Sequence, residues 1–283
     1  MAKVIAVCNQ KGGVGKTTTA INLGTFLALF GKKILLIDID PQGNATSGLG
    51  LNKHDIKTSV YDLVIDEIDP KPLILQTGIS NFSIIPSTLG LTGAEVELVG
   101  IMGREYRLKK AISPLLSEYD FIFIDCPPSL GLLTINAMAA ADSVLIPIQC
   151  EYYALEGLSQ LVNTINLVKE NINSALHVEG VLLTMADFRT NLTNEVIKEA
   201  RKFFKEKVYN TVIPRNIRLT EAPGFGKPIA IYDKNSIGAQ KYQAFANELL
   251  GIKKEESQNI ATIVADNLLP DNKLEKISEG EVK

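Results

Sequence analysis

The chain has 283 residues, 46% of them hydrophobic, so it can bury a sizeable core and is long enough for one large α/β domain or two small ones, which excludes a wholly disordered protein. Lys and Arg number 29 against 32 Asp and Glu, so the net charge is −3 and any nucleic-acid surface must be local. The three cysteines are too few for a disulfide framework, and they form no pair with metal-ligand spacing.

The N-terminus has no signal-peptide pattern, and no apolar run reaches the roughly 18 residues that a membrane span needs. We therefore expect a cytoplasmic protein. In a reducing compartment, cysteines such as Cys8 and Cys126, which lie in or just after apolar runs, are expected to be small buried hydrophobic side chains.

Short apolar runs alternate with segments of helical period, which predicts an α/β fold with a doubly wound, mostly parallel sheet flanked by helices. Strands are expected at 3–8, 33–38, 82–85, 120–125, 143–148, 178–183 and 208–213. Helices are expected from a Gly-rich turn through Phe30 and near 92–100, 104–117, 130–140, 155–170, 193–206 and 238–250. The helix at 104–117 must tolerate Pro114 near its end.

The character of the chain changes after Gly251. Residues 253–283 hold five lysines and seven acidic residues, and a short apolar cluster near 260–269 is compatible with one helix. We divide the chain into one folded domain at 1–251 and a flexible polar and acidic tail at 252–283.

The most informative motif is KGGVGKTT, Lys11 to Thr18, between the first predicted strand and the first predicted helix. Its glycines let backbone N–H groups close around phosphate oxygens, and the helix N-terminus adds positive partial charge. This context favours a nucleotide-binding P-loop over an ordinary tight turn. We expect Lys16 to contact the β- and γ-phosphates, Thr17 to bind Mg²⁺, and Thr18 to add a further contact. The predicted binding residues of the loop are Lys11, Gly12, Gly13, Val14, Gly15, Lys16, Thr17 and Thr18.

The loop departs from the standard P-loop pattern, because Gln10 stands where that pattern begins with Gly. A second lysine, Lys11, follows it. A lysine outside the cradle of the loop is poorly placed to duplicate Lys16, which suggests a different role.

Acidic residues follow two more predicted strands. Asp38 ends the apolar run at 33–38, Asp40 follows two residues later, and Asp125 ends the run at 120–125. Ligands of doubly wound sheets bind beyond the carboxyl ends of the strands, so these acids are expected beside the P-loop, with Asp125 as a Mg²⁺ partner. The alternative is that they are turn acids, which the prolines at 41, 127 and 128 allow.

Five motifs in this order resemble the ParA family of deviant-Walker ATPases, in particular its short chromosome-partitioning members of the Soj type. The resemblance covers about residues 2–250. Its motifs are KGGVGKTT, DIDPQGNAT (38–46), DCPPSLGLLT (125–134), QCEYYALEGL (149–158) and IPRNIRLTEAPGFGKP (213–228). Many plasmid-encoded relatives carry an N-terminal helix-turn-helix, whereas this chain starts at its first strand.

The resemblance implies a site that binds ATP and Mg²⁺ and closes as a sandwich homodimer when ATP is bound. Lys11 matches the signature lysine that reaches the ATP of the partner subunit. Asp40 matches the acid that orients the attacking water, and Asp38 and Asp125 match acids on the Mg²⁺ side. The segment beside the adenine corresponds to Pro214, Arg215 and Asn216.

The resemblance also implies non-specific DNA binding through Arg189 and Arg218, location on the nucleoid, and stimulation by a ParB-like centromere-binding partner. The segment from Arg189 through Lys227 contains nine basic residues and four acidic ones. Charge alone leaves a solvated helix face as an equal alternative, because several of the lysines share helical spacing with glutamates.

Three other functions use related machinery. A division-site ATPase of the MinD type ends in a basic amphipathic membrane helix, whereas residues 253–283 are net negative, so we expect no membrane partner. An electron-transfer relative of the nitrogenase iron protein would need cluster-bridging cysteines, and neither Cys126 nor Cys150 has a close partner in the sequence. A nucleotide-dependent scaffold with incidental hydrolysis is the third alternative.

Overall fold

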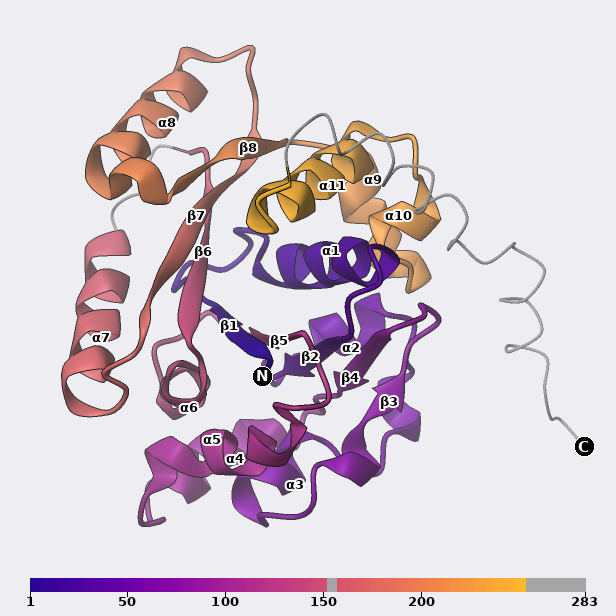
Figure 1. Ribbon diagram of the computed structural model, residues 1–283, viewed down its shortest axis with the longest axis vertical. Helices are drawn as coiled ribbons and strands as arrows, with labels where there is room; N and C mark the ends of the chain where they lie inside the picture. The colour runs from indigo at the N-terminus through magenta and orange to yellow at the C-terminus, as the bar shows by residue number, and fades with distance from the viewer. Residues whose placement is uncertain (152–156, 253–283) are drawn as a thin grey trace, which may run out of the picture.

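The computed structural model describes residues 1–151 and 157–252, which form one eight-stranded sheet with helices on both faces (Figure 1). The strands are β1 (Lys3–Val7), β2 (Ile34–Asp38), β3 (Leu75–Gln76), β4 (Phe82–Ile85), β5 (Phe121–Asp125), β6 (Ser143–Gln149), β7 (His177–Ala186) and β8 (Val208–Pro214). Their order is β3-β4-β2-β5-β1-β6-β7-β8, and every pair except β3 with β4 is parallel. The predicted doubly wound, mostly parallel sheet is confirmed.

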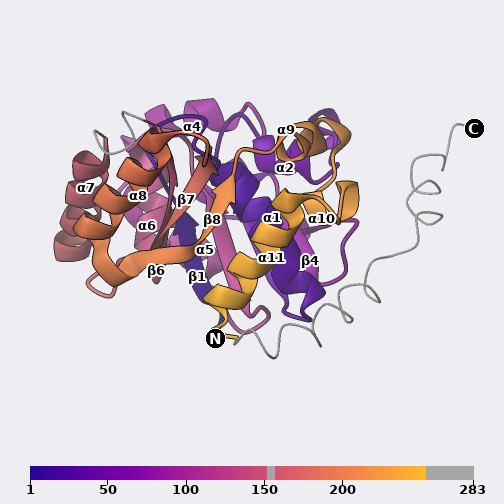
Figure 2. The same ribbon diagram turned by 90° about the horizontal axis from the view of Figure 1, so that it is seen from above.

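Eleven α-helices connect these strands within the described part of the chain. They are α1 (Lys16–Leu29), α2 (Asn44–Gly48), α3 (Val60–Ile65), α4 (Leu91–Leu98), α5 (Arg107–Ile112), α6 (Leu132–Ala140), α7 (Leu158–Asn171), α8 (Asn191–Phe204), α9 (Ile217–Glu221), α10 (Ile229–Tyr232) and α11 (Ile237–Leu249). Figure 2 shows α1 and α11 together over one part of the sheet, with α6, α7 and α8 grouped on the other side.

Alternation along the strands builds a core on each face of the sheet. In β1, Val4 and Ala6 belong to the hydrophobic cluster that includes residues of α4 to α8, whereas Ile5 and Val7 belong to the cluster around α1 and α11. Because successive side chains of a strand point to opposite faces, a strand covered on both sides reads as a continuous apolar run. The run at 3–8 has that form, and all three cysteines are buried and unpaired by disulfides.

The predicted helix at 104–117 is wrong. This segment forms a 3-10 turn at Arg104–Tyr106, the short helix α5, and a second 3-10 turn at Ser113–Leu115. Pro114 lies in the first turn of that last element and cannot donate the N–H that a continuous helix needs. The Ser113 hydroxyl bonds the Lys110 carbonyl at 2.8 Å, so this part of the backbone finds a side-chain donor.

Several short helices and one short strand were not predicted from the sequence. The helices α2, α3, α9 and α10 and the strand β3 are six residues or fewer in length. Such segments are too short to display a helical or strand period, so their patterns resemble loops. Part of the predicted helix at 155–170 and the possible helix at 260–269 lie outside the described residues, and the boundary at residue 251 stays a prediction.

The topology brings the sequence motifs to one edge of the sheet. Strands β1 and β2 flank β5, with Val7 and Asp38 both paired to Asp125. The connection from β1 runs through α1 to one side, and the connection from β5 runs through α6 on the opposite face to β6. This reversal creates a switch point at the carboxyl ends of β1 and β5, where doubly wound sheets bind their ligands.

The packing of α1 on β4 generates a stability prediction. Replacing a helical glycine by alanine ordinarily stabilises a helix by about 1 kcal/mol. A Cβ atom at Gly24, however, would lie 2.8 Å from Cζ of the fully buried Phe82 ring. We expect Gly24→Ala to lower the free energy of unfolding by about 1–3 kcal/mol in urea titrations. In combination with Phe82→Leu the cost should be less than the sum of the two single changes, and a stabilised Gly24→Ala protein would contradict the packing.

Candidate nucleotide-binding site

The loop between β1 and α1 has the backbone that phosphate binding requires. Gly13 and Gly15 have φ angles of 73° and 89°, in the left-handed region that glycine adopts without strain. Gly15 is the N-cap of α1, and the first turn of the 14-residue helix holds neither a side-chain cap nor an acidic residue. The N-terminal N–H groups of α1 are therefore not capped by a side chain, and an anion can satisfy them.

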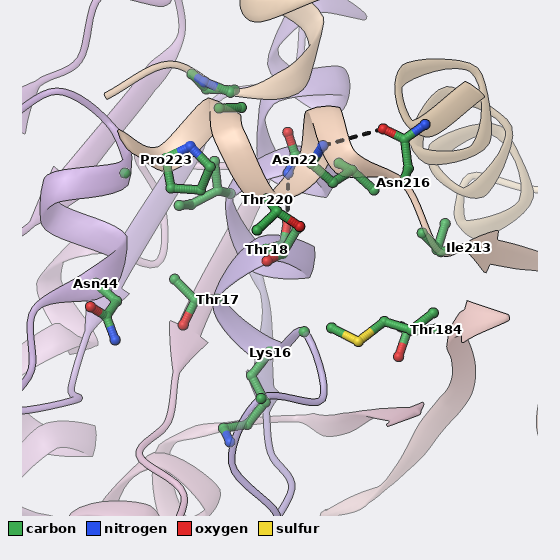
Figure 3. Close-up of a pocket in the computed structure, with 18 of the residues that line it drawn as sticks. Lys16, Thr17, Thr18, Asn22, Asn44, Thr184, Ile213, Asn216, Thr220 and Pro223 are labelled. Atoms are coloured by element: carbon green, nitrogen blue, oxygen red, sulfur yellow. Dashed lines mark hydrogen bonds between the residues drawn. The ribbon is translucent and has the colours of Figure 1, made fainter. Parts of the chain in front are cut away.

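A pocket of about 630 Å³ opens above this loop (Figure 3). Its lining includes Gly12, Gly13, Gly15, Lys16, Thr17 and Thr18 from the loop, together with Asp40. The Val14 side chain is 1% exposed, and its carbonyl accepts a 2.8 Å hydrogen bond from the Thr184 hydroxyl at the end of β7. This bond ties the loop to the far part of the sheet.

Lys16 supplies the buried cation of the pocket. Its side chain is buried, and Nζ donates a 3.2 Å hydrogen bond to the Lys11 carbonyl, which curls the loop around the ammonium group. Burial lowers the pKa of Lys16, and the neighbouring Asp125 opposes that shift. An anionic phosphate would relieve the desolvation of this ammonium group in the same way.

Asp125 is a fully buried acid whose two carboxylate oxygens have no hydrogen-bond partner of ordinary geometry. Burial, and after it the neighbouring Asp38, raises the pKa of Asp125 well above its usual range, whereas the Thr17 hydroxyl and Lys16 favour the charged form. An unpaired buried carboxylate beside a threonine hydroxyl fits Mg²⁺, a cation that prefers oxygen ligands and keeps several waters.

Asp38 has a different environment although it lies directly beside Asp125. Its Oδ2 accepts hydrogen bonds from the Thr46 backbone N–H at 2.8 Å and the Thr46 hydroxyl at 2.7 Å. Burial raises the pKa of Asp38 to about 6, against the effect of the bonds from Thr46. This arrangement favours a role in holding the loop at 40–46 in place, and a contact between Asp38 and Mg²⁺ stays a prediction.

Asp40 lies on that loop and lines the pocket. Its Oδ1 accepts a 2.9 Å hydrogen bond from the Gln42 N–H, which fixes the turn that begins at Asp40. The carboxylate is thereby held at the pocket wall by its own backbone rather than by a neighbouring strand.

The opposite end of the pocket is built from a distant part of the sequence. Pro214 ends β8, Arg215 and Asn216 follow it, and all three line the same cavity as the phosphate loop. The Asn216 side chain caps α9 by accepting the Leu219 N–H at 3.3 Å. Figure 3 shows Asn216, Thr220 and Pro223 on this wall, apart from Lys16 and Thr17.

Sequence reasoning missed several lining residues. They are Ile21, Asn22, Gln42, Asn44, Ser47, Gly48, Pro128, Thr184, Met185, Ile213, Leu219, Thr220, Ala222, Pro223, Lys227, Pro228 and Tyr242. Many of them fall inside motifs noted in the sequence, such as 38–46 and 213–228, so a signal was present for the segment but not for the individual side chain. Asn22 bonds the Thr18 carbonyl at 2.8 Å and accepts the Ile229 N–H at 2.7 Å, which no sequence pattern indicates.

Comparisons with known proteins agree with this site. A family model described as an AAA domain matches residues 2–178. The sporulation initiation inhibitor protein Soj of Bacillus subtilis is 59% identical over 249 residues, which cover 88% of this chain and 98% of that protein. The chromosome partitioning protein ParA of Myxococcus xanthus is 54% identical over 250 residues, 88% of each chain.

The chain belongs to the ParA/Soj family. Members of this family are P-loop ATPases, and this ParA/Soj protein is an ATPase whose ligands are ATP and Mg²⁺. The residues at its site fit both ligands, since the glycine loop offers N–H groups and Asp125 offers buried oxygens. None of the helices among the described residues is long and apolar enough to cross a membrane.

Solved structures place the ParA/Soj protein in the same fold group. Cobyrinic acid a,c-diamide synthase from Mycobacterium smegmatis, with bound ATP analog and magnesium, is 36% identical, with a TM-score of 0.78 over 88% of this chain and 95% of that one. The Cyanothece McdA(D38A)–ATP complex is 25% identical, with a TM-score of 0.80 over 89% and 98%. The septum site-determining protein MinD from Pyrococcus horikoshii, with Mg-ADP, is 25% identical, with a TM-score of 0.74 over 88% and 96%.

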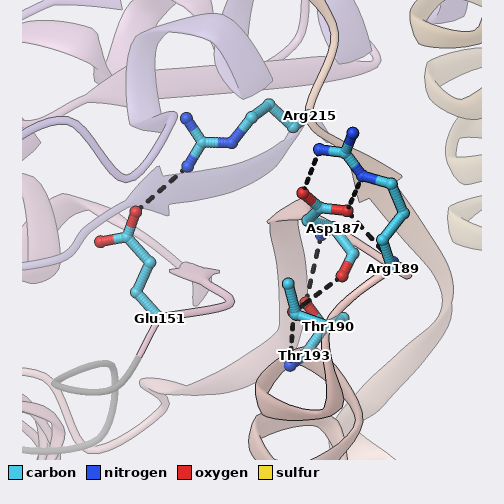
Figure 4. Close-up of polar contacts among 6 residues, drawn as sticks. All are labelled: Glu151, Asp187, Arg189, Thr190, Thr193 and Arg215. Carbon is cyan, nitrogen blue, oxygen red and sulfur yellow. Dashed lines mark hydrogen bonds and ion pairs between the residues drawn. The ribbon is translucent and has the colours of Figure 1, made fainter.

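Lys11 of the ParA/Soj protein takes no part in lining the pocket. Its Nζ lies 3.6 Å from Oε2 of Glu151, and its side chain is 40% exposed. Oε1 of the same glutamate lies 3.2 Å from Nη2 of Arg215 (Figure 4). The two lysines of the loop therefore occupy different environments, one buried in the pocket and one at the surface.

The two arginines predicted to bind DNA lie at the same edge of the sheet as the pocket. Arg189 comes shortly after β7 and Arg218 lies in α9, shortly after β8. Other basic residues of the segment from Arg189 through Lys227 lie elsewhere: Arg201, Lys202 and Lys205 line a separate hollow at the C-terminal end of α8.

The buried carboxylate of Asp125 generates a pH prediction for the ligand-free protein. Because its pKa is raised on folding, the folded state binds more protons than the unfolded state above about pH 4, so unfolding free energy falls as pH rises. Asp125→Asn removes the part of this dependence that Asp125 contributes. We expect the variant to be more stable than the wild type by about 1–2 kcal/mol at pH 8, with a smaller difference at pH 5.

Urea unfolding of both proteins without nucleotide at several pH values measures this difference. The same substitution should weaken the effect of Mg²⁺ on nucleotide affinity. A variant that is less stable than the wild type at pH 8 would show that Asp125 has a stabilising partner in the ligand-free protein.

Proposed function

We propose that this chain is a DNA-partitioning ATPase whose ATP-bound form is a sandwich homodimer that binds DNA without sequence preference. In this proposal hydrolysis releases the DNA, and a ParB-like centromere-binding protein stimulates hydrolysis. The protein would then act in the cytoplasm, on the nucleoid. The identity of 59% to Soj supports the partitioning role, and the observation that carries the dimer is the position of Lys11.

Lys11 supports a dimer because of where its side chain lies. It comes from the phosphate loop, yet its ammonium group lies outside the pocket that the loop builds, against an exposed glutamate. An exposed ion pair of this kind contributes little stability and is readily exchanged for another anion. A phosphate of a nucleotide held by a facing subunit is an anion of the required charge.

In the proposed reaction, a water oxygen bonds to the γ-phosphorus of ATP while the bond to the β–γ bridging oxygen breaks, and the water gives up a proton to the released phosphate or to solvent. Asp40 orients the water, and Thr17 and Asp125 would hold Mg²⁺, which would offset charge on the phosphates. Lys16 from the same subunit and Lys11 from the facing subunit offset the charge that develops in the transition state. Pro214, Arg215 and Asn216 contact the adenine end.

The main alternative is a membrane-cycling ATPase of the MinD type, since a MinD structure shares the fold. Residues 253–283, which are outside the described residues, carry five lysines against seven acids. Anionic membranes attract segments with an excess of positive charge, so this composition favours DNA as the partner.

The two lysines of the loop offer a matched pair of variants. We expect Lys16→Ala to weaken ATP binding by roughly 100-fold, because it removes charge-assisted bonds to two phosphates. Lys11→Ala should leave ATP affinity within about threefold of wild type but prevent the ATP-dependent dimer. Isothermal titration measures the affinity and sedimentation with ATP measures the dimer. A normal dimer of Lys11→Ala would contradict the role of Lys11 in the facing subunit.

DNA binding is tested by its dependence on salt. Contacts to phosphates release counterions, so affinity for unrelated duplexes should fall steeply with salt and vary little with sequence. Arg189→Glu and Arg218→Glu should each weaken binding to every duplex by about tenfold or more and leave ATP affinity unchanged, because neither arginine lines the pocket. The measurement is titration of labelled duplexes with the ATP-bound protein at two salt concentrations. Binding that is insensitive to salt, or unaffected by both changes, would mean that DNA is bound elsewhere or is not a ligand.

A further inference from the structure

Arg189, one of the two arginines assigned to DNA, is held by an aspartate two residues before it. Its Nε lies 2.8 Å from Oδ1 of Asp187 and its Nη2 lies 2.6 Å from Oδ2, so the contact is bidentate (Figure 4). The arginine side chain is 87% exposed. Hydrogen bonds from Arg189 lower the pKa of Asp187 to about 2, so the carboxylate is charged at neutral pH.

Arg218 is occupied in a similar way. Its Nη1 lies 3.0 Å from Oε2 of Glu221, and its Nε lies 3.5 Å from Oδ2 of Asp233. The Tyr232 hydroxyl donates to the same oxygen of Glu221 at 3.1 Å. Both arginines of the proposed DNA surface are thus paired with carboxylates of their own subunit, and Arg189 has the tighter of the two arrangements.

A guanidinium presents its N–H groups as a planar fork, and the edge formed by Nε and Nη2 matches both a carboxylate and a phosphate. At Arg189 this edge is the one that Asp187 occupies. A DNA phosphate must either displace the Asp187 carboxylate or accept hydrogen bonds from the remaining N–H groups of Arg189, next to the negative charge of Asp187. Both routes reduce the gain from the contact.

We propose that Asp187 competes with DNA phosphates for the guanidinium of Arg189 and thereby sets the affinity of the ATP-bound protein for DNA below what its arginines allow. This inference rests on the proposed function and concerns the strength of the same surface. Weak contacts of this kind make DNA binding readily reversible, so that it depends on the sum of contacts in a dimer.

Asp187 also has a local structural role, which the test must leave intact. Its Oδ1 accepts the Arg189 backbone N–H at 3.1 Å, and its carbonyl accepts the Thr190 hydroxyl at 2.9 Å at the start of α8. Asparagine keeps an Oδ1 acceptor for the Arg189 backbone N–H, and it replaces the charged Oδ2 that binds Nη2 by an uncharged amide nitrogen. The variant Asp187→Asn therefore separates competition from the geometry of the turn.

The experiment titrates unrelated duplexes with the ATP-bound protein across a series of salt concentrations. Asp187→Asn should bind about two- to fivefold more tightly per subunit, the range set by an exposed ion pair. If the freed arginine neutralises one more phosphate, the slope of log K against log salt should steepen by about 0.9 per subunit. Glu118→Gln is the control, since it removes the same charge from the exposed 2.9 Å pair with Lys71 just before β5, at the amino edge of the sheet. It should leave DNA affinity unchanged.

A double-mutant cycle shows whether the acid acts through Arg189. In the Arg189→Ala background, Asp187→Asn should give no further gain, because the competitor has lost its target. An equal gain with and without Arg189 would reveal general repulsion and overturn the proposal. DNA binding by the wild type together with no gain in Asp187→Asn would overturn this inference alone. A wild-type protein that does not bind DNA with ATP would overturn the proposed function as well.

Discussion

The structure depends on the meeting of charged groups at the carboxyl ends of three adjacent parallel strands. The strand register pairs Asp125 with Asp38 in β2 and with Val7 in β1, and β1 leads into the phosphate loop. Lys16, Asp38 and Asp125 are therefore buried close together, away from water. Burial of charge is costly unless the charge is compensated. Asp38 is compensated by hydrogen bonds from Thr46, whereas neither oxygen of Asp125 has a hydrogen-bond partner. The fold thus holds a buried carboxylate in a state that a bound cation would stabilise.

The part of this site that could be predicted from sequence is the part carried by short contiguous motifs. Strand β1, the glycines of the loop and Asp125 could be predicted, because an apolar run buried on two faces and a tight turn each have a recognisable local sequence pattern. Asn22 and Thr184 were not predictable, since their contacts to Ile229 and Val14 join segments about 170 to 207 residues apart. The prediction of one helix at 104–117 was wrong for a local reason, because Pro114 ends α5 before that segment is complete.

The far wall of the pocket suggests how the nucleotide and the DNA surface are connected. Helix α9 has only five residues, yet Leu219 and Thr220 line the pocket while Arg218 faces away from it toward Glu221 and Asp233. Arg215 shares Glu151 with Lys11, so the same wall also reaches the lysine assigned to the facing subunit. A nucleotide bound against this wall would therefore lie beside groups of both proposed interfaces.

The central claim is that burial raises the pKa of Asp125 and that bound Mg·ATP lowers it again. Titration calorimetry in buffers of different ionisation enthalpy measures the protons released on binding. The wild type should release more protons than Asp125→Asn in the same buffers, a comparison that cancels the protons contributed by ATP itself. Equal proton release by the two proteins, with Mg·ATP bound in both, would contradict the account.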